Sequence, residues 1–135
     1  MLYTINRGNV QGYTEGQKPV VHLVTSVEAA TALDRAWVFT DGHAEMFLSE
    51  FFDDLARLRD GVDWTVMRSR YWHDTADDGD RKRRRQAEFL VREFFPWDAI
   101  EQIGVINRDI GREVEAALLR AGHRPAIVIQ PDWYY

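Results

Sequence analysis

Hydrophobic residues recur along this chain at two spacings, one typical of strands and the other of helices. Runs of β-branched and aromatic residues between turn-forming residues predict strands, whereas apolar residues three and four positions apart predict amphipathic helices. The predicted strands are residues 2–5, 19–25, 36–40, 63–67, 87–91, 103–107 and 126–130. The predicted helices are residues 27–33, 43–58 and 109–121. Because strands outnumber helices and their order is mixed, the pattern favours an α+β fold.

The clearest helical pattern lies in residues 43–58, where apolar side chains recur at helical spacing directly after an Asp-Gly turn. Two polar stretches are expected to be loops. Residues 6–18 contain glycines without a Gly-x-Gly-x-x-Gly pattern, so this loop is not a dinucleotide-binding fingerprint. Residues 69–83 are predicted to form a loop with one helical turn around 70–73.

Composition limits the class of protein. The chain has 135 residues and 45% hydrophobic content, so one core and a single domain over residues 1–135 are expected. It has no cysteine, which excludes disulfides, zinc–thiolate sites and a thiol nucleophile. No apolar run approaches the roughly 20 residues that span a bilayer, and the first residues lack the apolar stretch of a signal peptide. A soluble, cytoplasmic protein is therefore expected.

The most informative stretch is a basic run followed by an apolar segment that contains one carboxylate. Five consecutive cations occupy residues 81–85, and Glu88 follows within residues 87–91. Several aspartates precede the run in a chain of net charge −5. A cationic patch in an acidic chain suggests a site for a polyanion, such as a nucleic acid or a phosphate group.

Glu88 is the first candidate for chemistry. A carboxylate within an apolar strand faces solvent, pairs with a cation or lines a cleft, because burial without a partner is costly. The neighbouring arginines are the expected partners. A structural ion pair and a catalytic role both fit this pattern.

The other candidates are cationic or aromatic. Arginine outnumbers lysine in the basic run, and its planar guanidinium suits phosphate and stacks on bases, so Arg81, Arg84 and Arg85 are candidate nucleic-acid or NAD contacts. A solvated basic face is the alternative. His43 begins the predicted helix and could contact a phosphate there. Trp72, beside cations, could stack on a base or pin its loop.

At these residues the sequence resembles the DarT family of ADP-ribosyltransferases, which modify thymidine in single-stranded DNA using NAD. The resemblance is carried by Arg70-Tyr71-Trp72-His73-Asp74-Thr75, Asp80-Arg81, Arg84-Arg85 and Ala87-Glu88-Phe89-Leu90-Val91, and more loosely by Val21-His22-Leu23, Asp41-Gly42-His43 and Pro131 to Tyr135. It covers most of the chain, and the Arg-Arg-x-Ala-Glu-x-Leu-Val string is its most specific part.

The resemblance implies an ADP-ribosyltransferase-like fold with mixed, mostly antiparallel sheets flanked by helices. It implies that NAD is the substrate, that no metal is required and that Glu88 is the catalytic residue. The loop with Arg81, Arg84 and Arg85 would help to choose the DNA target. The protein would be the toxin of a toxin–antitoxin system, whose partner is a DarG-like macrodomain antitoxin.

The chain also departs from the family pattern. Family members are longer at the N-terminus, where a His-Thr NAD-binding element and a further arginine lie. The chain then corresponds to the C-terminal two-thirds of a DarT-like domain, and Met1 to an internal methionine. We expect such a form to be inactive by itself, because the groups that orient NAD are missing, and to associate through unpaired strand edges.

Two other functions stay open on the residues alone. A non-catalytic single-stranded nucleic-acid-binding module would use the basic run and the aromatic residues but not Glu88. A metal-dependent nuclease would use His73 and the neighbouring aspartates as ligands, although this segment lacks a second organised ligand set. Cleavage that stops with a chelator would indicate the nuclease, whereas transfer from NAD would leave the strand intact.

Overall fold

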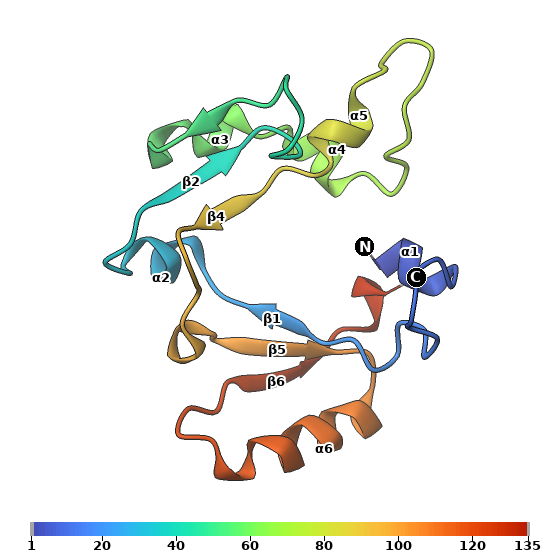
Figure 1. Cartoon of the computed structure of the whole chain (residues 1–135), viewed down its shortest axis with the longest axis vertical. Helices are drawn as coiled ribbons and strands as arrows, with labels where there is room; N and C mark the ends of the chain where they lie inside the picture. Colours follow the sequence, from blue (N-terminus) through green and yellow to red (C-terminus); the bar gives the residue numbers. More distant parts are fainter. Residues whose placement is uncertain (1, 135) are drawn as a thin grey trace. The chain divides into compact units, whose positions relative to one another are not determined.

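The computed structural model describes residues 2–134 of the chain (Figure 1). Its backbone contacts divide into two compact units, one of residues 1–32 and 96–135 and the other of residues 33–95. The first is called the terminal unit and the second the central unit. Each contains a three-stranded sheet. Along residues 2–134, no helix is both long and apolar enough to cross a lipid bilayer.

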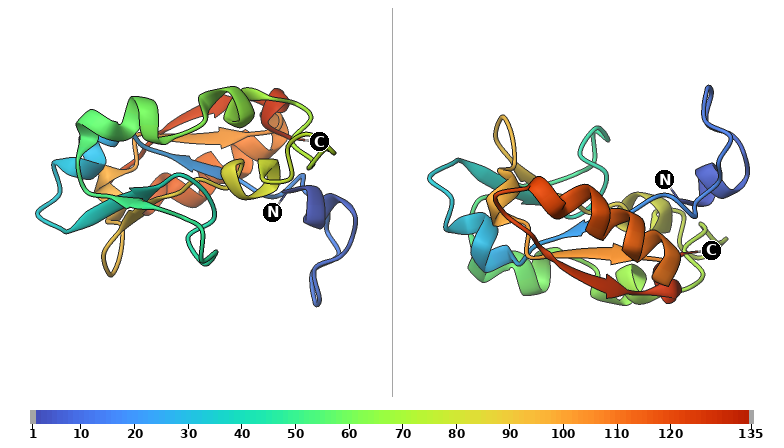
Figure 2. Two further views of the ribbon diagram at one scale, coloured as in Figure 1. Left: turned by 90° about the horizontal axis from the view of Figure 1, so that it is seen from above. Right: turned by 90° about the horizontal axis from the view of Figure 1, so that it is seen from below.

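The terminal unit is built on the sheet β1–β5–β6, with strands His22–Val24, Gln102–Val105 and Ala126–Ile129. β1 is antiparallel to β5, with His22 opposite Gly104, and β6 is parallel to β5. Helix α6 (Arg108–Ala117) connects β5 to β6 and packs on the sheet where Gly111 faces Val105. Figure 2 shows α6 lying across these strands. This packing leaves the side chain of Val105 fully buried.

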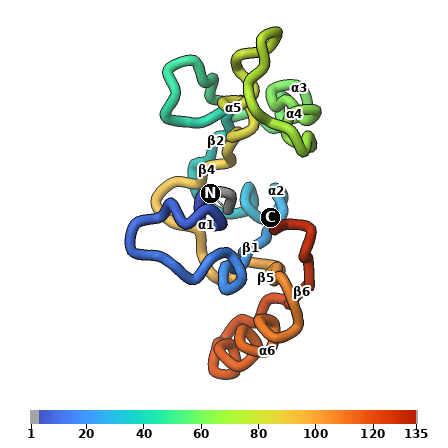
Figure 3. Tube along the Cα trace, turned by 90° about the vertical axis from the view of Figure 1, so that its right-hand side faces the viewer, coloured from blue at the N-terminus to red at the C-terminus, as the bar shows by residue number. Residues whose placement is uncertain are grey.

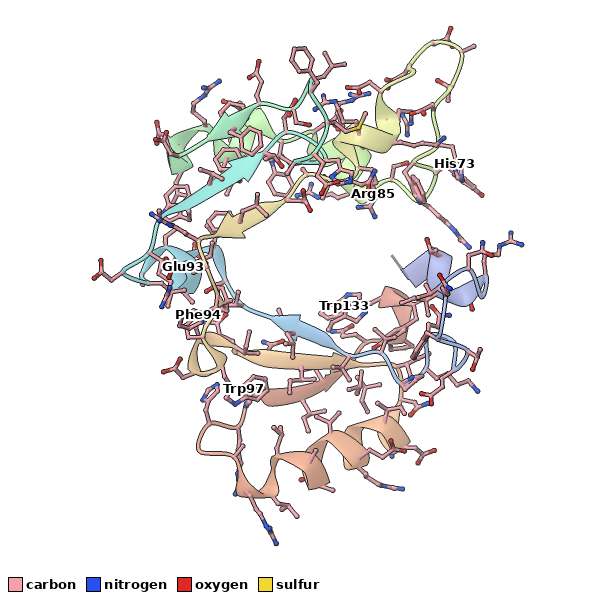
Figure 4. All side chains as sticks on the ribbon, viewed as in Figure 1. His73, Arg85, Glu93, Phe94, Trp97 and Trp133 are labelled. Carbon is pink, nitrogen blue, oxygen red and sulfur yellow. The ribbon has the colours of Figure 1, made fainter. Side chains whose placement is uncertain are left out.

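Aromatic residues near the C-terminus pack on the β1–β5 pair. The indole of Trp133 lies so close to Gly104 that a Cβ at this position would approach the ring to 2.4 Å, so only glycine fits (Figure 4). The hydroxyl of Tyr134 donates a hydrogen bond to the carbonyl of Val20 at 2.7 Å. The His22 ring lies edge-on to both aromatic rings, and burial lowers the pKa of His22. These contacts join the chain's C-terminal segment to the segment that leads into β1.

Shorter elements complete the terminal unit: α1 (Leu2–Asn6), α2 (Val27–Thr31) and the 3-10 turns η2 (Trp97–Ala99), η3 (Leu118–Arg120) and η4 (Pro131–Trp133). Two helices have side-chain N-caps. The Ser26 hydroxyl accepts the backbone N–H of Ala29 before α2, and Asn107 accepts two backbone N–H groups at the start of α6. Both caps satisfy donors that a helix leaves unpaired at its N-terminus.

The central unit is built on the antiparallel sheet β3–β2–β4, with strands Phe51–Phe52, Trp37–Thr40 and Phe89–Val91. Phe39 and Phe52 stack at 4.9 Å and form the core with Val62. The turn η1 (Leu55–Arg57) and helices α3 (Leu58–Gly61), α4 (Trp64–Arg68) and α5 (Arg81–Arg84) follow β3. Between α4 and α5 the chain makes a loop that projects beyond both helices (Figures 1 and 3).

Several predictions from the sequence are confirmed. Strands form at the predicted segments 19–25, 36–40, 87–91, 103–107 and 126–130; most are shorter, and β5 begins before its segment, at Gln102. Helices α2 and α6 form in the segments 27–33 and 109–121. Ser26 caps α2, whereas α6 ends at Ala117, before Gly122. Local chemistry therefore suffices to locate these elements.

Other predictions from the sequence are wrong. Residues 2–5 lie in helix α1 rather than a strand, and residues 63–67 belong to helix α4, which Asp63 caps by accepting the Val66 N–H. Residues 81–84, expected in a loop, form α5. Residues 43–58 do not form a helix: turns are followed by β3, η1 and α3. The periodicity there does not mark a buried face, because the Phe47 side chain is 100% exposed and Phe51 pairs with β2.

Candidate active site

Glu88 directly precedes strand β4, and hydrogen bonds to Thr40 fix its backbone. The Thr40 N–H donates to the Glu88 carbonyl at 2.9 Å, and the Glu88 N–H donates to Thr40 Oγ1 at 3.0 Å. Thr40 is fully buried, and its hydroxyl donates to the Gly42 carbonyl at 2.6 Å. One buried hydroxyl thus joins the end of β2, the Asp-Gly turn and the start of β4. Glu88 is therefore held by the sheet rather than by a mobile loop.

The side chain of Glu88 turns toward the segment that follows the Asp-Gly turn. Its Oε2 accepts the backbone N–H of Ala44 at 2.8 Å and lies 3.7 Å from Nδ1 of His43. His43 Nδ1 is buried and has no hydrogen-bond partner among the described residues. The carboxylate is 40% exposed, so it is oriented on one side and open to solvent on another. This arrangement suits a group that acts on a bound molecule.

Arg83 connects this segment to the basic run. Its guanidinium binds Asp80 with two hydrogen bonds of 2.8 Å and also donates to Asp41 at 2.9 Å and to Ser49. The backbone carbonyl of Arg83 accepts the N–H of His43 at 3.0 Å. Only 9% of the Arg83 side chain is exposed. Arg83 is a structural tie between α5 and the turn beside Glu88.

Gly42 is required by this close packing. A Cβ at residue 42 would lie 2.4 Å from Arg83 Nη1 and 2.9 Å from the Arg83 carbonyl oxygen. A carbonyl oxygen cannot move aside as a flexible side chain does. The glycine of the Asp-Gly-His motif therefore allows α5 to approach the site, in addition to forming a turn.

Arg84 and Arg81 are also engaged with carboxylates and backbone groups. Arg84 pairs with Asp63, the N-cap of α4, and with Asp78 in the projecting loop. Arg81 lies 3.8 Å from Asp78 and donates to the carbonyl of Tyr71 at 2.7 Å. The basic run is thus largely neutralised by acids from the same unit, which shape the loop before α5.

These ion pairs make the central unit sensitive to acid. The Arg84 guanidinium lowers the pKa of Asp78, and the Arg83 guanidinium lowers the pKa of Asp80, both from an ordinary value of 3.8. A carboxyl whose pKa is lowered by folding stabilises the fold fully above its unfolded pKa, and this contribution is lost as the pH falls through the native pKa. We therefore expect the free energy of unfolding to decrease as the pH drops below 3.8.

Urea unfolding of the chain and of two variants on both sides of that pH measures the effect. Asp80→Asn removes one titrating group and should flatten the pH dependence. Asp77→Asn is the control, because its exposed side chain makes no hydrogen bond or ion pair within the described part of the chain. Equal slopes for the two variants would contradict the assignment to Asp80.

Arg85 differs from the other cations of the basic run in having no acidic partner, and Trp72 lies in the loop before that run. Arg85 caps the C-terminus of α5, and its guanidinium makes no hydrogen bond or ion pair with any residue between 2 and 134 (Figure 4). Trp72 is partly buried and stacks on His73 with 4.7 Å between the ring centroids. Arg85 is therefore a cation available to a ligand, and Trp72 is part of the aromatic surface of the loop.

Comparison with known protein families identifies the family of this chain. A family model described as "ssDNA thymidine ADP-ribosyltransferase, DarT" matches residues 1–135. The chain belongs to the DarT family. Membership agrees with the resemblance stated above for the segments around residues 70–75 and 80–91.

Relatives and solved structures of DarT proteins agree. A DNA ADP-ribosyl transferase of Thermus sp. (strain 2.9) is 39% identical over 137 residues, covering 100% of this chain and 63% of the relative. The structure of Thermus sp. 2.9 DarT in complex with NAD+ has a TM-score of 0.89 and 37% identity, covering 99% of this chain and 66% of that one. The structure of the same DarT in complex with ADP-ribosylated ssDNA also has a TM-score of 0.89, and the match covers 63% of that chain. This chain thus spans about two thirds of their length.

These matches confirm the predicted α+β fold of the ADP-ribosyltransferase type. In this DarT-family chain, the structure brings Glu88 and His43 together and keeps Arg81, Arg84, Arg85 and Trp72 in the same unit. The prediction that an arginine pairs with Glu88 is wrong. Among the described residues, the Glu88 carboxylate accepts the Ala44 N–H and lies 3.7 Å from His43 Nδ1. Arg81, Arg83 and Arg84 instead pair with aspartates.

Sequence reasoning missed Thr40 and Ala44. Thr40 ends a β-branched and aromatic run just before Asp41-Gly42, so a hydroxyl at a strand end beside a turn was a usable signal. Ala44 contributes only its backbone N–H and leaves no signal in the sequence. Of the carboxylates suggested as metal ligands, Asp74, Asp78 and Asp80 pair with the basic run, and residues 2–134 contain no group of three or more His, Asp or Glu side chains arranged to hold a metal.

Proposed function

We propose that this chain contributes the catalytic carboxylate and the DNA-facing loop of an NAD-dependent transferase that attaches ADP-ribose to thymidine in single-stranded DNA. The single observation that carries the proposal is the position of Glu88. It lies at the start of a strand, held by Thr40, with one carboxylate oxygen on the Ala44 N–H and the side chain 40% exposed. Family membership over residues 1–135 supports the same reaction.

The proposed step uses a negative charge twice. The bond between nicotinamide and ribose breaks, and its electron pair leaves with nicotinamide, so positive charge develops on the ribose. A nearby carboxylate stabilises that charge. The nitrogen that carries the N–H of the thymine base then bonds to the ribose carbon, and its proton passes to Glu88. The strand is not cleaved, and no metal takes part.

The remaining residues would bind and orient the two substrates. His43 lies beside Glu88, and Arg85 keeps an unpaired guanidinium, so both fit a contact with a phosphate of NAD or DNA. Trp72 would add stacking in the loop. Arg81 and Arg84 hold that loop through Asp78, and any DNA contact they make would come in addition to this role.

The biological role follows from the family. A protein that modifies single-stranded DNA in its own cell acts as a toxin, and its natural partner would be a DarG-like antitoxin with a macrodomain that removes ADP-ribose. The curated relatives are longer than this chain, and the match covers 63% of the Thermus relative.

A single assay tests the proposal against its alternatives. Single-stranded oligonucleotides with and without thymidine are incubated with the protein and with NAD labelled in its adenosine part, in the presence or absence of a chelator. We expect label only on thymidine-containing strands, of unchanged length, with no effect of the chelator. Binding without labelling would indicate a non-catalytic module, and chelator-sensitive shortening would indicate a nuclease.

A further inference from the structure

The cations of the central unit differ in their partners. Residues 81–84 of the basic run pair with aspartates, whereas Arg85 does not. Arg59 and Arg68, at the ends of α3 and α4, make no ion pair or side-chain hydrogen bond with any of residues 2–134. Both are exposed. The positive charge available to an outside anion therefore lies partly on α3 and α4, away from the run that dominates the sequence.

Arg59 and Arg68 line neighbouring hollows of the surface, which together we call the Trp64 groove. It consists of two adjoining hollows of about 460 and 600 Å³ that share Trp64 and Arg68. Their lining residues are Leu55, Leu58, Arg59, Asp60, Trp64, Thr65, Arg68, Ser69 and Arg81. Three arginines and one aspartate give this lining a net positive charge.

An exposed aromatic ring stands at the centre of the Trp64 groove. Trp64 begins helix α4, and its indole N–H donates to the carbonyls of Leu58 and Arg59 at 3.3 and 3.0 Å. These bonds fix the ring, yet 38% of the residue is exposed. A fixed ring has little conformational freedom to lose when a planar ligand stacks on it.

The far end of the groove leads into the loop before the candidate active site. Arg81 donates to the carbonyl of Tyr71 at 2.7 Å, while its Nε is buried without a hydrogen-bond partner. Tyr71 is 77% exposed. Arg81 also begins α5, the helix that precedes Glu88. Exposed aromatic rings and cations thus alternate from α3 to this loop.

We propose that the Trp64 groove binds a stretch of single-stranded DNA adjacent to the nucleotide that is modified. A base stacks on Trp64, while Arg59 and Arg68 contact the flanking phosphates, and the strand continues past Arg81 toward Glu88. Single strands are held in this way by proteins that combine cationic grooves with exposed aromatic rings. The inference rests on the proposed function only in naming DNA as the strand.

Fluorescence anisotropy of a labelled single-stranded oligonucleotide, measured without NAD, tests the groove independently of catalysis. Trp64→Ala should weaken binding roughly tenfold, because one stacked base is lost. Arg68→Ala should reduce the slope of log affinity against log salt by about 0.7, the value expected for one phosphate contact on a single strand. Trp64→Phe keeps an aromatic face and should bind nearly as well as the unchanged chain.

Two matched controls accompany these variants. Trp97 is 39% exposed, close to the 38% of Trp64, but lies outside the groove, so Trp97→Ala should leave affinity unchanged. Arg92→Ala removes an exposed arginine outside the groove and should leave the salt slope unchanged. Circular dichroism of each variant reports whether the fold is intact.

The outcomes separate this inference from the proposed function. Wild-type affinity for both Trp64→Ala and Arg68→Ala, or no binding of the single strand by the unchanged chain, would overturn the groove. If Glu88 variants lose transfer while groove variants bind normally, the proposed function stands and the groove does not. If groove variants lose binding while the unchanged protein shows no transfer from NAD, the groove stands and the proposed reaction does not.

Discussion

Replacing Glu88 by glutamine should reduce ADP-ribose transfer by at least about 100-fold, because a neutral amide can neither stabilise positive charge on the ribose nor accept the proton of the base. The amide oxygen can still accept the Ala44 N–H, which Glu88 accepts at 2.8 Å. The fold and the affinity for DNA are therefore expected to persist. The rate of label transfer from NAD to a thymidine-containing oligonucleotide measures the effect.

The experiment is carried out on a form of the protein that transfers ADP-ribose to the oligonucleotide. Glu45→Gln is the matched control, because Glu45 is an exposed carboxylate one residue from Ala44. Its activity should equal that of the unchanged protein. Transfer by Glu88→Gln at the rate of Glu45→Gln would show that Glu88 is not the catalytic group.

Replacing Arg83 by alanine should destabilise the central unit by about 2 kcal/mol, because the nearly buried guanidinium loses its hydrogen bonds to two charged carboxylates. Arg83 is 9% exposed and binds Asp41 and Asp80, which lie in different segments. Its loss would also release the turn that orients His43 and Ala44. Urea unfolding monitored by circular dichroism gives the change in the free energy of unfolding.

Lys82 supplies the control within the same run. Its side chain is 54% exposed and lies 3.5 Å from Asp74, so Lys82→Ala should change stability by less than about 1 kcal/mol. If the run acted only as a solvated basic face, both substitutions would be nearly neutral. Equal stability of Arg83→Ala and Lys82→Ala would therefore contradict the structural role of Arg83.

The role of the basic run at residues 81–85 depends on the aspartates that pair with it, and these are not evident from the sequence. The basic run and Glu88 stand out in the sequence, and both belong to the candidate site. Their interactions were not predictable, because Asp41 and Asp63 lie far from α5 along the chain and approach it only when β2 and α4 pack. The acids near the run lowered the expected net charge but did not show which arginine each would bind.

The helix predicted for residues 43–58 illustrates the opposite error. Apolar residues at helical spacing usually mark a face that packs on a core. Here Phe51 and Phe52 pair with β2, while Phe47 stays exposed. Pairing with β2 satisfies backbone groups at Phe51 and Phe52, so sheet formation outweighed the local pattern there.

Short-range chemistry was sufficient for the α+β class, for capped helices such as α2 and for the candidate carboxylate, because each depends on neighbours within a few residues. The orientation of Glu88 by Thr40 and Ala44 and the neutralisation of Arg83 and Arg84 arise from contacts between distant segments. Those contacts form only when the chain packs, since a hydrogen bond or ion pair requires its two groups to meet in space.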